Sequence, residues 1–301
     1  MKNIIDSLRS SRKTAWKFKS LPALVFLLLL WAGCGQEGEK ISQAAPERII
    51  SMAPSITETL FALGLGDCVV AVSNFCNFPE EAKKKPRIGG VLNPNWEMII
   101  SLSPDLVIAP ESAILKDGFE KYKIPYLTVT VNTLEDIFSA LKEIGQATGK
   151  EREVNELISQ MEAEIKQVSE LVSDLPRPKT FLVIAYQPLT AAGKDTYLDE
   201  LITLAGGENI LGDKEKDYPK VSMEEVVRRA PEVILSATFG DERLDFWQRY
   251  GSIPAVKSGR IHNLENDAVV HPGPRVAEAL HILARLIHPE AFEENQSRGG
   301  G

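Results

Sequence analysis

The feature that most constrains the fold of this chain is an internal duplication. Residues 95–108 align without gaps on residues 222–235, at an offset of 127 positions. Each copy reads as a helix cap, a short helix, a proline that ends the helix, an acid and a buried strand. A unit repeated once in a chain of 301 residues favours two similar lobes over one larger domain.

A second pair of segments extends the duplication. Residues 55–58 (Ser-Ile-Thr-Glu) and 196–199 (Thr-Tyr-Leu-Asp) each place a hydroxyl residue three positions before an acid. This is the pattern of a capping box or a near-variant of it. Glycines follow at Gly64 and Gly206, where a helix would end. We therefore predict a helix in each lobe, capped by the first residue of each segment.

Continuous apolar runs alternate with these helices. Runs without polar alternation are typical of parallel strands that are covered by helices on both faces. The predicted strands are residues 48–52, 69–73, 106–109, 126–129, 181–185, 233–236 and 261–264. The sequence thus predicts an α/β fold of two Rossmann-like lobes with parallel sheets, at residues 46–150 and 178–292.

One long amphipathic segment separates the predicted lobes. Apolar residues recur every three or four positions from Val154 to Val172, which predicts a helix over residues 151–174 about 36 Å long. We assign residues 151–175 to this backbone helix and expect it to resist large hinge closure. Residues 293–301, which end in three glycines, are expected to form a flexible tail.

The first 33 residues differ from the rest of the chain. They carry six basic side chains and one acid, and they contain an apolar run at 21–33. That run is too short to span a bilayer but fits a secretory signal peptide. It ends Trp31-Ala32-Gly33-Cys34, which resembles the lipobox of bacterial lipoproteins. The resemblance implies cleavage before Cys34, a lipid on its thiol, a tether at residues 34–45 and a place on the periplasmic side of the cell envelope; an uncleaved signal anchor is the alternative.

Cys68 and Cys76 are the remaining cysteines. They bracket the predicted strand at 69–73, and eight extended residues span about 26 Å, whereas a disulfide needs Cα atoms about 5.5 Å apart. We therefore predict two free thiols. No paired Cys/His spacing in the sequence indicates a structural metal.

Several classes of function lack support in the sequence. A net charge of −8 gives no indication of nucleic-acid binding. Residues 64–69 begin like a dinucleotide loop but lack the third glycine and follow a predicted helix, and no nucleophile motif is present. The histidines are His262, His271, His281 and His288. None lies in the first lobe, so a bare-cation site between the lobes is poorly supported, and we assign His281 and His288 to packing or surface roles.

Aromatic residues gather near the predicted ends of strands and starts of helices. Phe75 and Phe78 follow the second strand, Tyr186 follows the strand at 181–185, and Tyr218 precedes the helix that begins after Ser222. A cleft between two α/β lobes that is lined by such side chains suits a bulky, partly apolar ligand.

The chain resembles the helical-backbone substrate-binding proteins of ABC importers, which serve cobalamin, haem and iron-siderophores. The similarity runs from about residue 46 to residue 290. The segments that carry it are residues 48–58, 61–66, 89–95, 192–194, 205–210 and Pro272-Gly273-Pro274-Arg275. The family fold is the two-lobed fold predicted above, and the resemblance implies a receptor that has no enzymatic activity.

Within that family, residues 73–79 followed by Gly-Gly-x-x-Asn-Pro look most like the vitamin B12 branch. The resemblance implies that Phe75 and Tyr218 line a corrin cleft and that residues Asp267–His271 form another wall. The sequence departs from the branch at His271, where arginine is usual. Val91 and Pro110 also replace tryptophans. His271 is interpreted as a surface residue, a polar contact to ligand amides or an axial ligand to iron or cobalt, and the last role keeps haem as an alternative.

Glu97 and Glu224 are equivalent positions of the duplication, each in the first turn of a predicted helix. Acids there complement the helix dipole, but that role does not require the same register in both lobes. The resemblance implies that each acid docks on arginines of a pseudo-twofold permease.

We therefore predict a monomeric receptor without a cofactor that captures cobalamin or a related corrinoid. It would deliver this metal chelate to an ABC permease and its ATPase. Haem or an iron-siderophore is the alternative ligand. A metal-cation receptor or an envelope enzyme are less favoured classes.

Overall fold

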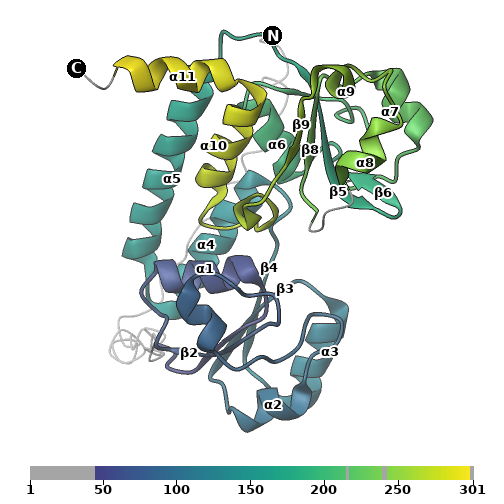
Figure 1. Ribbon diagram of the computed structural model, residues 1–301. Helices are drawn as coiled ribbons and strands as arrows, with labels where there is room; N and C mark the ends of the chain where they lie inside the picture. The colour runs from purple at the N-terminus through teal and green to yellow at the C-terminus, as the bar shows by residue number, and fades with distance from the viewer. Residues whose placement is uncertain (1–44, 215–216, 239–242, 299–301) are drawn as a thin grey trace, which may run out of the picture. The chain divides into compact units, whose positions relative to one another are not determined.

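The computed structural model describes residues 45–214, 217–238 and 243–298 (Figure 1). The predicted signal peptide, Cys34 and most of the tether lie outside these residues. Within the described ranges, no helix is both long enough and apolar enough to cross a bilayer.

The first lobe is built on a parallel sheet. Its strand order is β2-β1-β3-β4, and each neighbouring pair runs parallel, as the apolar runs predicted. The strands are β1 (Ile49–Ser51), β2 (Val69–Val72), β3 (Leu106–Pro110) and β4 (Tyr126–Val129). The helices are α1 (Pro54–Ala62), the 3₁₀ helix η1 (Glu80–Lys84), α2 (Trp96–Ser101), α3 (Ala113–Tyr122) and α4 (Leu134–Thr148).

The second lobe has a separate sheet with the order β6-β5-β8-β9, and β7 pairs with β5. The strands are β5 (Lys179–Tyr186), β6 (Leu189–Ala191), β7 (Glu208–Asn209), β8 (Val233–Ser236) and β9 (Ile261–Asn263). The helices are α6 (Tyr197–Leu204), α7 (Met223–Arg229), α8 (Arg243–Gln248), α9 (Pro254–Ser258), the 3₁₀ helix η2 (Asp267–Val270), α10 (Val276–Ile287) and α11 (Pro289–Arg298). β6 is antiparallel to β5, because the short connection between them cannot make a parallel crossover.

Helix α5 (Glu151–Val172) joins the lobes and ends two residues before the predicted limit. It packs against α4 of the first lobe and α10 of the second (Figure 1). Its buried face, which includes Val154, Met161 and Val172, belongs to one apolar cluster that continues into both lobes. The lobes therefore share a core along this helix, and the described residues from Ala45 onward form one compact unit.

The two copies of the duplication match in local geometry. Asn95 caps α2 and Ser222 caps α7, and each side chain accepts a hydrogen bond from the backbone N–H three residues later. After each helix, Ser103 (φ 44°) and Ala230 (φ 51°) adopt the left-handed conformation, which is uncommon for residues other than glycine. The predicted equivalence of the copies is confirmed at the helix cap and at the residue that follows the helix.

The acids after the prolines are also equivalent. Asp105 accepts hydrogen bonds from the backbone N–H groups of Glu47 and Arg48, at 2.8 and 3.0 Å. Glu232 accepts one from the N–H of Lys179 at 2.9 Å. Each acid thus satisfies a free donor at the beginning of the central strand of its lobe.

The predicted capping boxes formed only in part. Thr196 caps α6 by accepting from the N–H of Asp199, at 3.1 Å, but the Asp199 carboxylate accepts from Asn209 Nδ2. The prediction for α1 was wrong. This helix begins at Pro54, and within the described residues no side chain caps it, because a proline in the first turn lacks one of the N–H groups that need a cap.

The predicted flexible tail also differs from the structure. Helix α11 continues to Arg298, so residues 293–298 are helical. Pro289 in the first turn and Glu290 after it are favourable residues for starting a helix.

Candidate functional site

Phe75 and Phe78, the predicted ligand residues of the first lobe, follow the carboxyl end of β2, which pairs with β1. In the first sheet β1 lies between β2 and β3, so the order of the chain reverses there. Ligands of α/β proteins bind at such switch points, beyond the carboxyl ends of the strands. Helix α1 leaves this edge after β1, and the loop that carries Phe75 and Phe78 leaves it after β2.

A buried carboxylate of α1 connects the two lobes. The Glu58 side chain is only 1% exposed. Arg275, the residue before α10, donates from Nε to Glu58 Oε2 at 2.9 Å and from Nη2 to Glu58 Oε1 at 2.7 Å. This paired geometry is the strong form of an arginine–carboxylate contact. We call this pair the interlobe tie.

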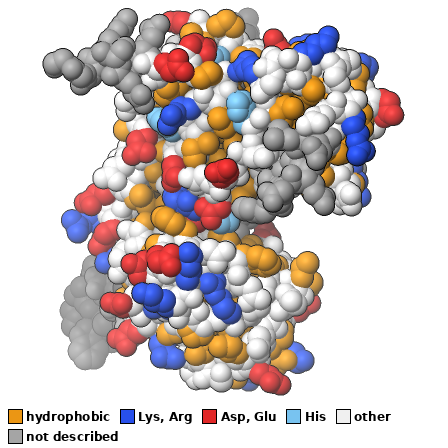
Figure 2. Space-filling model, viewed as in Figure 1, with side chains coloured by type: hydrophobic (Ala, Val, Ile, Leu, Met, Phe, Trp, Pro, Cys, Tyr) orange, Lys and Arg blue, Asp and Glu red, His pale blue; other side chains and the backbone are white. Residues whose placement is uncertain are grey.

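Two of the predicted ligand residues belong to the same network. His271 Nδ1 lies 3.0 Å from Glu58 Oε1, and Asp267 Oδ1 accepts from Arg275 Nη2 at 2.7 Å. Burial of Arg275 lowers its pKa, but the hydrogen bonds to Glu58 and Asp267 outweigh that effect and raise the net pKa above its ordinary value. In Figure 2, acidic and basic side chains gather where the lobes meet.

Phe78 contacts the interlobe tie from the first lobe. Its ring lies under the Arg275 guanidinium, with 4.1 Å from Cζ to the ring centroid, which is a cation–π distance. Phe78, Glu58 and Arg275 line a pocket of about 650 Å³ that reaches Leu157 on α5. The structure therefore brings together three predicted ligand residues, Phe78, Asp267 and His271.

Phe75 lies on the same loop and is 67% exposed. Arg87 holds the loop, because its Nη1 donates to the carbonyl groups of Ser73 and Cys76, both at 2.8 Å. A Cβ at Gly90 would lie 3.2 Å from Phe75 Cε2, so the ring rests on a position without a side chain. The loop thus presents a large apolar ring to solvent.

Tyr218 lies at the edge of the second sheet, beside β6. The bridge between Thr190 and Lys220 and the 2.9 Å hydrogen bond from Gly193 N–H to the Asp217 carbonyl place it there. Its side chain is 38% exposed. Burial, with a smaller contribution from the charge of Asp217, raises the pKa of Tyr218 to about 12, so the phenol is neutral at physiological pH.

Tyr186 is the last residue of β5 rather than part of a loop. Its hydroxyl group accepts from Trp247 Nε1 at 2.9 Å and donates to Ser236 Oγ at 3.3 Å. Its ring packs against Phe246. These contacts are those of a residue that belongs to the core of the second lobe.

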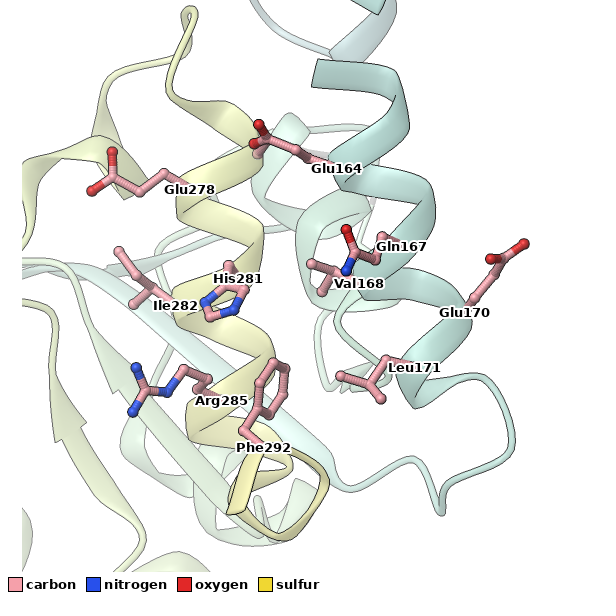
Figure 3. Close-up of a pocket in the computed structure, with 11 residues that line it drawn as sticks. Glu164, Gln167, Val168, Glu170, Leu171, Glu278, His281, Ile282, Arg285 and Phe292 are labelled. Atoms are coloured by element: carbon pink, nitrogen blue, oxygen red, sulfur yellow. The ribbon is translucent and has the colours of Figure 1, made fainter. Parts of the chain in front are cut away.

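A second groove, larger than the pocket at the interlobe tie, is not lined by any of the predicted ligand residues. It has a volume of about 730 Å³ and lies between α5, α10 and α11 (Figure 3). Leu171, Ile282 and Phe292 form its apolar part, and acids such as Glu164 and Glu278 stand at its rim. Among the described residues, Phe75, Tyr186 and Tyr218 line neither this groove nor the pocket at the interlobe tie.

The predicted docking acids are both accessible. Glu97 on α2 and Glu224 on α7 are exposed and lie in the first turns of their helices. Hydrogen bonds from its own backbone N–H and from Ser222 lower the pKa of Glu224. Each acid is followed three residues later by an exposed aliphatic side chain, Ile100 or Val227.

The other histidines have separate surroundings. His281 is exposed and contacts Phe292 edge-on, whereas His288 is buried between α10 and α11 with Nε2 3.2 Å from the Gly206 carbonyl. The part of the chain that the structure describes contains no cluster of three His, Cys, Asp or Glu side chains suited to a metal ion.

The two described cysteines are free thiols, as predicted. Cys76 is buried beside Ser73, with 3.1 Å between Sγ and Oγ. Burial raises the pKa of the Cys76 thiol, which disfavours the reactive thiolate.

Known proteins share this sequence and fold. Residues 49–268 match the family described as periplasmic binding protein. An uncharacterised ABC transporter substrate-binding lipoprotein of Bacillus subtilis strain 168, YvrC, is 32% identical over 83% of this chain and 82% of its own length. A vitamin B12-binding protein of Vibrio campbellii is 31% identical over 78% of this chain and 86% of its own. The periplasmic heme-binding protein RhuT of Roseiflexus sp. RS-1, in its apo form, superposes with a TM-score of 0.74 at 29% identity, over 81% of this chain and 99% of that one.

Proposed function

This chain belongs to the periplasmic binding protein family, and we propose that the solute it captures is cobalamin or a related corrinoid. It is a solute-binding protein of an ABC transporter, so its partners are a permease and an ATPase. Such a protein binds a solute and delivers it to the permease. We therefore assign roles to its residues from the contacts that they can make with a solute or with the permease.

The observation that carries the proposal is the convergence of three side chains on the interlobe tie. Phe78, Asp267 and His271 all contact Glu58 or Arg275. They combine an apolar ring with an acid and an imidazole, which suits a ligand that has an apolar face and polar edges. The similarity to the vitamin B12-binding protein of Vibrio campbellii supports a corrinoid, whose macrocycle carries amide side chains.

Each predicted residue has a role in this proposal. The exposed rings of Phe75 and Tyr218 supply apolar contact area from the two lobes, while Asp267 and His271 offer polar contacts at one side. Tyr186 supports the wall of the second lobe through its hydrogen bonds to Trp247 and Ser236.

Delivery requires contact between the receptor and its permease. We assign docking to Glu97 and Glu224, because the duplication places the two acids at equivalent exposed positions. Opposite charges across an interface orient a complex more than they tighten it. A lipid on Cys34 would hold the monomeric receptor at the membrane, near its permease.

Haem or an iron-siderophore is the second candidate ligand. It is favoured by His271, since imidazole is a common ligand of haem iron, and by the similarity to the heme-binding protein RhuT.

Calorimetric titration of the purified protein with cyanocobalamin, haemin and a ferric siderophore tests the proposal. We expect cyanocobalamin to bind with a Kd below about 1 μM, a binding free energy of about −8 kcal/mol or better. A flat cyanocobalamin titration together with a new Soret band on adding haemin would overturn the choice of ligand.

A further inference from the structure

The Glu58 carboxylate forms a buried ion pair with Arg275. Its side chain is 1% exposed and receives two N–H groups of Arg275. Both Glu58 oxygens are therefore hydrogen-bond acceptors.

The ion pair between Glu58 and Arg275 fixes the proton of His271. A neutral imidazole carries its proton on one nitrogen and a lone pair on the other. Since Nδ1 lies 3.0 Å from Glu58 Oε1, a lone pair on Nδ1 would face a negative oxygen, whereas an N–H there donates to it. The proton thus belongs on Nδ1, and the lone pair on Nε2.

Nε2 is left available to a ligand. His262 Nε2 is buried and has no hydrogen-bond partner among the described residues, whereas His271 Nε2 is not among such buried atoms. No residue in the described ranges forms a hydrogen bond with it. His271 therefore presents an unshared electron pair to solvent.

The first lobe controls this feature of the second. Glu58 lies on α1, and His271 lies between η2 and α10, 213 positions away. Near this pair Gly273 packs against α1, because a Cβ at Gly273 would lie 2.9 Å from Ser55 Cβ and 3.1 Å from Ser55 Cα. The backbones of the two lobes are thus in direct contact beside the pair.

We propose that Glu58 is a positioning residue that holds His271 as the Nδ1–H tautomer, so that Nε2 acts as an electron-pair donor to the bound solute. The inference deepens the proposed function and rests on it for the identity of the solute. The group recognised is an electron-pair acceptor, either an amide N–H at the edge of the ligand or the metal at its centre.

The tautomer is tested directly by long-range ¹H–¹⁵N correlation spectra of ¹⁵N-histidine-labelled protein at pH 8.5. His271→Gln assigns the signals. We expect the proton on Nδ1 of His271 without any ligand present. A proton on Nε2 would overturn the inference, whichever solute the protein carries.

The positioning role is tested by coupling between variants. We expect His271→Ala to weaken cyanocobalamin binding about tenfold, the effect of one hydrogen bond, and Glu58→Gln to weaken it less. In the Glu58→Met/Arg275→Met background, which keeps side-chain volume should Glu58→Gln fail to fold, His271→Ala should cost nothing further. If instead the affinity losses of the variants multiply, Glu58 affects binding only through the stability of the fold and does not position His271. His281→Ala is the control, and we expect no effect on affinity.

Absorption spectra distinguish an amide N–H from the metal as the group that His271 contacts. A change in the cobalt or Soret bands that disappears in His271→Ala identifies the metal, whereas an affinity loss without a spectral change identifies an amide N–H. If the wild-type protein binds no cyanocobalamin, the proposed ligand fails, and the tautomer measurement still decides the role of Glu58.

Discussion

Arg275 Nη2 of the second lobe donates to Glu58 Oε1 of the first lobe at 2.7 Å, across 217 positions of sequence. The same nitrogen also donates to Asp267. The pair thus links the lobes and orients the residues that we assign to the ligand.

Arg275→Met should destabilise the protein, because it leaves the Glu58 carboxylate buried without its partner. Breaking one side of a buried ion pair costs about 3–5 kcal/mol, measurable by urea denaturation. The control is Arg228→Met. Arg228 is 70% exposed and pairs with Glu225, and the loss of such a surface pair costs about 1 kcal/mol or less. Equal losses in the two variants would contradict a structural role for the interlobe tie.

Gly273→Ala should force the lobes apart locally. The added Cβ would lie 2.9 Å from Ser55 Cβ and 3.1 Å from Ser55 Cα, and overpacking costs about 1–3 kcal/mol. We expect a lower melting temperature and weaker solute binding. Gly251→Ala is the matched control, since its Cβ position is open. The same melting temperature in both variants would count against close contact at Gly273.

Phe75→Ala should reduce solute affinity while leaving stability unchanged. The ring is 67% exposed, so truncation creates no cavity. A lost aromatic contact in a binding site costs about 1–3 kcal/mol, which is about fivefold to 150-fold in Kd. Leu92→Ala serves as the control, because Leu92 is 81% exposed on a nearby loop. Calorimetry of both variants gives the answer. Unchanged affinity in Phe75→Ala removes this residue from the site.

Reversal of charge at both Glu97 and Glu224 should abolish import of the solute by cells and leave its binding by the purified protein unchanged. Like charges placed together across an interface cost several kcal/mol. Glu135→Arg is the control, as Glu135 is an exposed acid in the first turn of α4. Weaker solute binding by the double variant would argue against a pure docking role.

His262 should make stability fall on the acid side of neutrality. Burial, with a smaller effect of the Arg260 charge, lowers the pKa of His262, and its buried Nε2 has no partner among the described residues. The folded state therefore favours the neutral imidazole. The stability gained in this way is fully present above pH 6.5, the pKa of an unperturbed histidine, and is lost as pH falls through the lower pKa of His262 in the folded protein. Between pH 8 and pH 5, the melting temperature of His262→Phe should fall less steeply than that of the wild type. Parallel slopes would refute the prediction.

The fold was largely predictable because its signals are local. Apolar runs located β4 and β8 at their observed bounds, and the three-to-four residue periodicity located α5 within two residues. The short strands β6 and β7 were missed, since neither has an apolar run and both form only beside β5.

The site was predictable only in part. Phe78, Asp267 and His271, three of the six residues predicted to bind the ligand, lie together around Arg275 and Glu58, but Glu58 was interpreted as part of a helix cap. The pattern of a hydroxyl residue three positions before an acid fits a cap equally well, and only Pro54 in the first turn argued against it. Tyr186 was placed in a loop because the preceding apolar run ends one residue earlier.

The sequence by itself determined the duplication, the order of helices and strands, and the exposed equivalence of Glu97 and Glu224, because backbone hydrogen bonding and apolar periodicity act within a few residues. Only the tertiary structure decided that Glu58 would face Arg275 and His271. A carboxylate loses its water when it is buried and must then pair with whichever donors the fold brings to it, and these donors come from the other lobe.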